Sequence, residues 1–100
     1  MRTVRYHPEA RTEFLQQVEY DAAICTRLAE RDDRAVRKAE TQAAATPDAC
    51  PPYKHGSRRV VDRRFKFSLV YLHTESEIRV VAVAPTRRKP GYWRARLGGA

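Results

Sequence analysis

The sequence predicts an α+β fold, a small twisted and largely antiparallel sheet packed on one face by an N-terminal helical hairpin. Three runs rich in Val, Ile, Phe and Tyr follow one another between residues 58 and 93, separated by turn-sized gaps. Two stretches with helical spacing precede them, and a short alternating run opens the chain. Because 100 residues leave room for one core, we expect a single domain over residues 1–100, in the order β-α-α-β-β-β with a short terminal helix.

The first strand is expected over residues 3–7, where TVRYH alternates between apolar and polar side chains. Pro8 then suits the first turn of a helix, and Glu9 complements the positive end of the helix dipole. From residue 8 to about residue 22 apolar residues recur every fourth position, which predicts an amphipathic helix. The stripe expected to face the core consists of Ala10, Phe14, Val18 and Ala22, with Leu15 beside them.

A second helix is expected from about residue 27 to residue 45, after a tight turn near residues 24–26 with Thr26 as its N-cap. Its apolar stripe is thin: Leu28, Val36, Ala39 and Ala43. Asp32 occupies a position where the spacing predicts an apolar residue. Because alanine buries little area, we expect this helix to dock weakly and its end to be the most mobile helical part.

The prolines and the glycine of TPDACPPYKHGS predict a loop over residues 46–57, and three strands follow over residues 58–65, 66–74 and 78–84. The last of these, IRVVAVA, is almost entirely apolar, which is typical of a central strand, and Pro85 ends it. Residues 90–97 predict a short closing helix that needs tertiary contacts, and residues 98–100 a frayed tail.

The net charge is +8, and the positive charge is concentrated in the second half of the chain. Residues 1–50 hold eight Lys/Arg against nine Asp/Glu, whereas residues 51–100 hold twelve against three. Such a field attracts polyanions or an acidic partner segment. No apolar run approaches the roughly 20 residues that cross a bilayer. The start, MRTVRYHPEA, lacks the apolar region of a signal peptide, so we expect no membrane association and a cytoplasmic location.

Metal and cofactor chemistry is not expected, because the chain has neither a nucleotide-binding glycine loop nor a metal-ligand spacing. Cys25 and Cys50 are expected to be free thiols without assigned chemistry. The histidines are isolated along the chain and are expected on the surface or at strand edges: His7, His55 and His73. Carboxylates are too scarce after residue 50 to favour a paired-carboxylate hydrolase.

Cationic and aromatic residues remain as candidates for a binding surface. Arginine binds phosphate in a bidentate manner and aromatic rings stack on bases, while Tyr92 or a cation could assist proton transfer. On the strand over residues 58–65, Arg59 and Arg63 would share a face, with Arg58 and Arg64 on the other. For Trp93 a packing role is favoured. The candidate residues for this binding surface are Arg58, Arg59, Arg63, Arg64, Arg87, Arg88, Tyr92 and Trp93.

Three segments resemble the RelE/ParE superfamily, the toxins of bacterial type II toxin–antitoxin (plasmid stabilisation) modules: HPEARTEFLQQVEY, RRVVDRRFKFSLVY and IRVVAVAPTRRKPGYWRARL. The resemblance covers nearly the whole chain. It implies a helical hairpin on a twisted antiparallel sheet, and a cognate antitoxin whose acidic segment wraps the basic groove in a toxin–antitoxin hetero-oligomer.

The resemblance also implies a target. RelE-like members cut mRNA in the ribosome with several basic residues and a terminal aromatic residue, whereas ParE-like members poison DNA gyrase. This chain has Val61 and Ser68 where RelE-like members carry basic residues, and Trp93 at the terminal tyrosine position cannot exchange a proton. The chain is therefore similar to ParE-like gyrase inhibitors, with no catalytic residue assigned.

Two other functions are compatible with the arginine cluster. A ribosome-dependent endoribonuclease would use Arg59, Arg63 and Arg87, with RNA and the ribosome as partners. A nucleic-acid-binding module would carry the same charge without toxicity. Because the apolar stripe of the second helix is thin, we expect the melting temperature of the free protein to lie well below that of its antitoxin complex.

Overall fold

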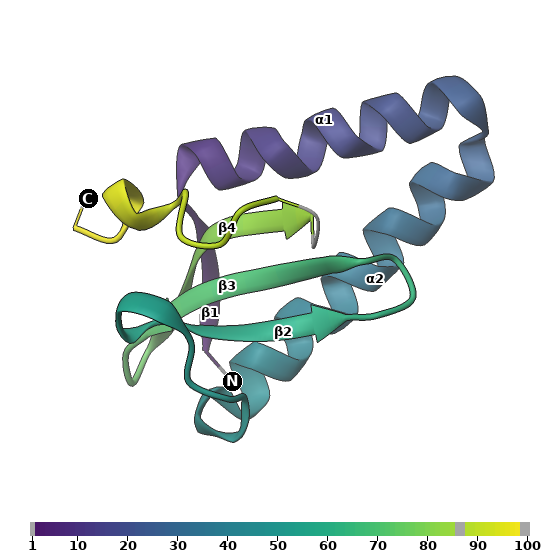
Figure 1. The fold of residues 1–100 in the computed structure, drawn as a ribbon. Coiled ribbons are helices and arrows are strands. Elements are labelled where there is room, and N and C mark those ends of the chain that lie inside the picture. Colours follow the sequence, from purple (N-terminus) through teal and green to yellow (C-terminus); the bar gives the residue numbers. More distant parts are fainter. Residues whose placement is uncertain (1, 86–87, 99–100) are drawn as a thin grey trace.

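The computed structural model describes residues 2–85 and 88–98, which form an α+β fold (Figure 1). The helices and longer strands are β1 (Thr3–Tyr6), α1 (Pro8–Ile24), α2 (Thr26–Ala45), β2 (Arg58–Asp62), β3 (Phe67–His73) and β4 (Glu77–Pro85). The predicted order of elements is therefore confirmed. The expected loop contains two short 3-10 turns, Pro47–Ala49 and Lys54–Gly56, and the expected terminal helix is a third, Arg94–Arg96.

The four strands lie in the order β1-β4-β3-β2, so β4 is central, as its apolar sequence predicts. It pairs with β3 in an antiparallel manner, and β3 pairs with β2 in the same way. Strand β1 runs parallel to β4, however, which makes the sheet mixed rather than antiparallel throughout. A register shift between Val70 and Tyr71 leaves Val81 as an extra residue in β4.

The two faces of the sheet are covered by different parts of the chain. The helical hairpin covers one face, where Ala10 and Val36 pack against Leu69, Ile78 and Val80. On the other face Tyr92 and Leu97 pack against a second core of Val70, Val81, Ala82 and Ala84, which Trp93 completes. Among the described residues, neither helix is long and apolar enough to cross a membrane.

Helix α1 contacts the sheet only near its start, which corrects the predicted stripe. Ala10 is buried, but Phe14 and Val18 are half-buried, and Leu15 and Ala22 are exposed. In Figure 1 the helix continues past the ends of the strands, so its later turns have no sheet beneath them. Helix α2 keeps its thin stripe inward: the buried residues are Ala35, Val36, Ala39, Ala43 and Ala44.

Two predicted boundaries are wrong for local reasons. Cys25 is the extended residue between the helices and the N-cap of α2, so Thr26, the predicted N-cap, is the first helical residue. Strand β2 ends at Asp62, because its Oδ1 atom accepts a hydrogen bond of 2.9 Å from the backbone N–H of Phe65 and turns the chain. Arg63 and Arg64 therefore lie in the β2–β3 turn and not on a strand.

Candidate anion-binding groove

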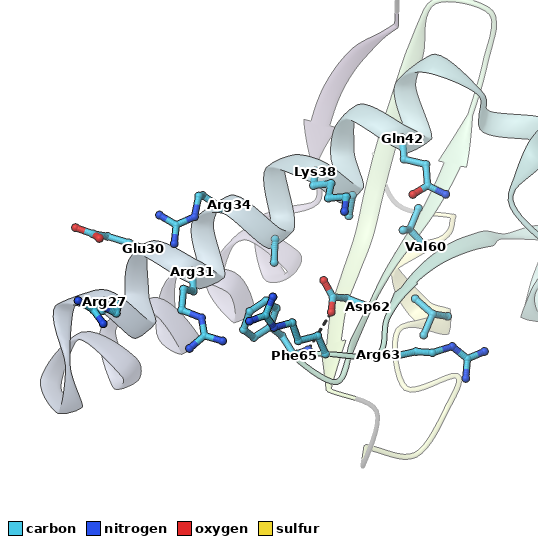
Figure 2. A pocket seen from close by; sticks show the side chains of 14 residues that line it. Arg27, Glu30, Arg31, Arg34, Lys38, Gln42, Val60, Asp62, Arg63 and Phe65 are labelled. Carbon is cyan, nitrogen blue, oxygen red and sulfur yellow. Dashed lines mark hydrogen bonds between the residues drawn. The ribbon is translucent and has the colours of Figure 1, made fainter.

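A groove with a volume of about 820 Å³ separates α2 from β2 and the β2–β3 turn (Figure 2). We call it the cationic groove, because six cationic side chains and two acidic ones line it. The cations are Arg27, Arg31, Arg34 and Lys38 from α2, with Arg63 and Arg64 from the turn. The acids are Glu30 and Asp62, and the apolar lining comes from Ala35, Ala39, Val60, Val61 and Phe65.

The cationic side chains on the α2 side of the groove lie in a row because of their spacing in the sequence. Residues 27, 31, 34 and 38 are separated by four, three and four positions, which places their side chains on one face of α2. At a rise of about 1.5 Å per residue, this cationic row extends over roughly 16 Å. Next to it, the buried Ala35 and Ala39 bring the helix backbone close to the sheet, so the row stands at the edge of an apolar surface.

An aromatic contact joins the turn to the helix across the groove. The Cζ atom of Arg31 lies 5.0 Å from the ring centre of Phe65, and that of Arg64 lies 5.5 Å from it. Both distances fit cation–π attraction. The turn is also fixed by the Asp62–Phe65 hydrogen bond, which Figure 2 draws as a dashed line. The groove is thus built from two elements that lie far apart in the sequence.

Its positive charge is not neutralised within the described part of the chain. None of the six cations forms an ion pair there; the ion pairs found involve Arg5, Arg37, His73, Arg88 and Arg96. Asp62, one of the two acids in the groove, is already used in the turn. A concave surface lined mostly by positive side chains has a strong positive electrostatic potential, which attracts anions.

The arginines predicted on the second strand are divided among three environments. Arg58 donates from Nη1 to the carbonyl oxygens of Cys50 at 2.6 Å and Asp48 at 3.3 Å, so it secures the loop before β2. Arg59 lies next to it in β2, with its Cζ atom 4.0 Å from the ring centre of Tyr53. Of the predicted set, only Arg63 and Arg64 line the cationic groove.

The C-terminal candidates are held by contacts within the protein. Arg88 donates from Nη1 to Glu13 Oε2 at 3.3 Å, and its Cζ atom lies 3.5 Å from the ring centre of Tyr92. The Tyr92 hydroxyl is buried, and burial, followed by the nearby Glu13 carboxylate, raises the pKa of Tyr92. Trp93 is 1% exposed and fills the second core, which agrees with a packing role. Arg87, the remaining candidate, lies outside the described residues.

Of the ribonuclease set Arg59, Arg63 and Arg87, the structure describes the first two. Arg59 is in β2 and Arg63 is in the turn, so they do not share a strand face as predicted. The same described residues contain no cluster of His, Cys, Asp and Glu that could hold a metal ion. Cys25 and Cys50 are free thiols, the first exposed and the second buried.

Two arrangements were missed by the sequence analysis. The cationic row of α2 could have been found from the spacing of its arginines, which is visible in the sequence. The second arrangement is a buried ion pair in which Arg96 donates to Glu13 from Nη1 at 2.9 Å and from Nη2 at 3.2 Å. Arg96 also donates to the Val81 carbonyl at 3.0 Å. No local signal reveals this pair, because its partners are 83 residues apart.

Comparison with known proteins gives no assignment: no model of a protein family matches the chain, and no curated protein matches it significantly. Membership of the RelE/ParE superfamily therefore stays a prediction.

Proposed function

We propose that the protein is the toxin component of a type II toxin–antitoxin module, acts in the cytoplasm on DNA gyrase, and is neutralised by an acidic segment of its cognate antitoxin. The observation that carries this proposal is the cationic groove, with its row of unpaired cations along α2. The order β-α-α-β-β-β, in which a helical hairpin covers one face of the sheet, also supports it.

The groove is chemically suited to a polypeptide rather than to a bare phosphate backbone. In an extended chain the side chains on one side repeat about every 6.6 Å, close to the 4.5–6 Å between successive cations of α2. Acidic side chains on that side would meet Arg31 and Arg34. Apolar side chains on the other side would meet Ala35, Ala39 and Val60, an apolar surface that a phosphate backbone would not use.

Binding to a protein target is favoured over RNA cleavage by the positions of the other candidates. Arg58 is engaged with loop carbonyls, Arg88 with Glu13, and Trp93 is buried. The buried Tyr92 hydroxyl has a raised pKa, so it is poorly suited to lose a proton near neutral pH. These contacts leave few groups free for acid–base chemistry in the described part of the chain.

The target is tested by a gyrase supercoiling assay with the purified chain, in which relaxed, supercoiled and cleaved plasmid are separated on a gel. We expect loss of supercoiling or accumulation of cleaved plasmid. Normal supercoiling by gyrase in the presence of folded protein would contradict the proposed target. Cleavage of mRNA in a translation extract, with gyrase unaffected, would favour the ribonuclease alternative instead.

The groove is tested separately with a fluorescent peptide of alternating Glu and Val, whose binding is followed by fluorescence anisotropy. We expect the double variant R31Q/R34Q to bind about tenfold more weakly, since each lost charge contact contributes about 0.5–1 kcal/mol. The variant R11Q/R94Q is the matched control, because it removes the same charge from exposed arginines outside the groove. Equal weakening in both variants would show that only net charge matters and would refute the groove.

A further inference from the structure

Asp32 lies on α2 at the position where the sequence pattern predicts an apolar residue, and it faces the other helix. It lines a second cavity, of about 640 Å³, together with Phe14, Leu28 and Val36. Its Oδ2 atom is buried, and no donor of the described residues reaches it. A carboxylate in such a place loses hydration without gaining a hydrogen bond, which favours the protonated form.

Asp21 on α1 lines the same cavity, and its carboxyl is a partner within reach of the Asp32 carboxyl. Asp21 Oδ2 already accepts a hydrogen bond of 3.0 Å from Gln17 Nε2. Two ionised carboxylates can only accept, so a hydrogen bond between them requires that one keeps its proton. Burial and the Asp21 carboxyl raise the pKa of Asp32 to about 7, and the hydrogen bond with Asp32 lowers the pKa of Asp21.

Other charged groups around the pair do not replace the proton. Arg31, the neighbour of Asp32 on α2, lowers the pKa of Asp32, but less than burial and Asp21 raise it. From the other elements, Glu13, Lys66 and Arg88 line the same cavity. Of these, Glu13 and Arg88 are paired with each other at 3.3 Å.

Several large apolar side chains in this part of the hairpin remain exposed. On α1, Leu15, Tyr20 and Ile24 remain 44%, 67% and 62% exposed. Ala10, the buried residue of α1, lies at the opposite end of the helix. The two carboxyls therefore lie in a part of the hairpin that these apolar side chains do not close.

We propose that Asp21 and Asp32 form a proton-dependent clamp, which closes the distal half of the helical hairpin while the pair shares one proton and loosens it when both carboxyls ionise. Asp32 directly follows Arg31 of the cationic row, so the clamp also affects how firmly α2 holds the start of that row. The inference stands on the contacts of the hairpin and does not require the proposed toxin function.

The direction of the pH effect follows from the pKa of Asp32, which is raised in the folded protein from 3.8 to about 7. Its contribution to stability is complete below about pH 4 and is lost as the pH rises through about 7. The lowered pKa of Asp21 acts only at the acid end, where its contribution is lost as the pH falls below 3.8. The clamp should therefore loosen between about pH 4 and pH 7, with little further change well above pH 7.

The protonation step is tested by following the carboxyl ¹³C shifts of the full chain against pH. We expect Asp32 to titrate with a midpoint near pH 7, and a midpoint below pH 5 would overturn the proposal. The loosening is tested by amide hydrogen exchange over residues 15–34, corrected for the intrinsic pH dependence. We expect the opening constant to rise about tenfold or more from pH 6 to pH 8.

Two variants separate the clamp from general effects of charge. D32N should remove the pH dependence of the opening constant, because an asparagine can donate to Asp21 at every pH. D33N is the matched control and should keep that pH dependence, since Asp33 is the next residue and pairs with Arg37 at 2.7 Å instead. The same pH response in D32N and in the unmodified chain would overturn the proposal.

Discussion

The two halves of the helical hairpin differ in what lies beneath them. The proximal half, residues 8–14 and 35–45, rests on the sheet and buries small side chains such as Ala10, Ala39 and Ala43. The distal half, residues 15–34, contains the end of the hairpin that projects past the strands in Figure 1, and it exposes Tyr20 and Ile24. Close packing thus holds the proximal half, whereas charged groups determine the properties of the distal half.

The cationic groove and the proposed carboxyl clamp both involve this distal half, and they lie on different sides of α2. The cationic row begins at Arg27 on the side that faces the β2–β3 turn, and Asp32 lies on the side that faces α1. Exposed cations such as Arg27 and Arg34 cost little free energy at a site that the sheet does not cover. The carboxyl of Asp32 is partly buried and costs little there only while it keeps its proton. The packing of the proximal half stabilises the hairpin. The distal half can therefore carry charged side chains.

The difference in packing between the two halves is tested most directly by introducing the same polar side chain into each half. Ala39→Gln should destabilise the fold by about 4 kcal/mol, since it overpacks a buried site and leaves an amide unpaired. Ala22→Gln, at an exposed position of the distal half, should change the free energy of unfolding by less than about 0.5 kcal/mol. Urea unfolding measures both values, and similar losses would show that the halves are equally packed.

A smaller effect is expected where the proximal half of α1 meets the C-terminal segment. Glu13→Gln should cost about 3 kcal/mol, because it leaves the buried guanidinium of Arg96 without its main partner. Glu9→Gln is the matched control: the Glu9 side chain is largely exposed and lies 3.4 Å from Arg96, so its loss should be small. Thermal unfolding of both variants distinguishes them, and equal melting temperatures would contradict the role of Glu13.

The smallest effect is expected from the exposed apolar residues of the distal half. Ile24→Ser should alter the free energy of unfolding by less than about 0.5 kcal/mol, because the side chain is already in water. A loss above 2 kcal/mol in urea unfolding would mean that Ile24 is buried in solution. Such a result would remove the distinction between the two halves.

Much of the fold could be predicted because its signals are local. Pro8 marks the start of a helix, Pro85 ends a strand, and the apolar run over residues 78–84 identifies the central strand. The stripe of α1 was predicted too long for a reason that no local pattern contains. Spacing shows which residues share a face, but it does not show how far the sheet extends beneath them.

The sequence by itself determined the order of the elements, the helix-covered sheet and the row of cations on α2, because each depends on spacing within one segment. Only the tertiary structure decided that Arg63 and Arg64 join that row, through a turn fixed by Asp62. It also buried Trp93 and placed Asp32 and Asp21 around one cavity. These contacts join different elements of the fold. They depend on strand register and helix length, which are properties of the whole fold.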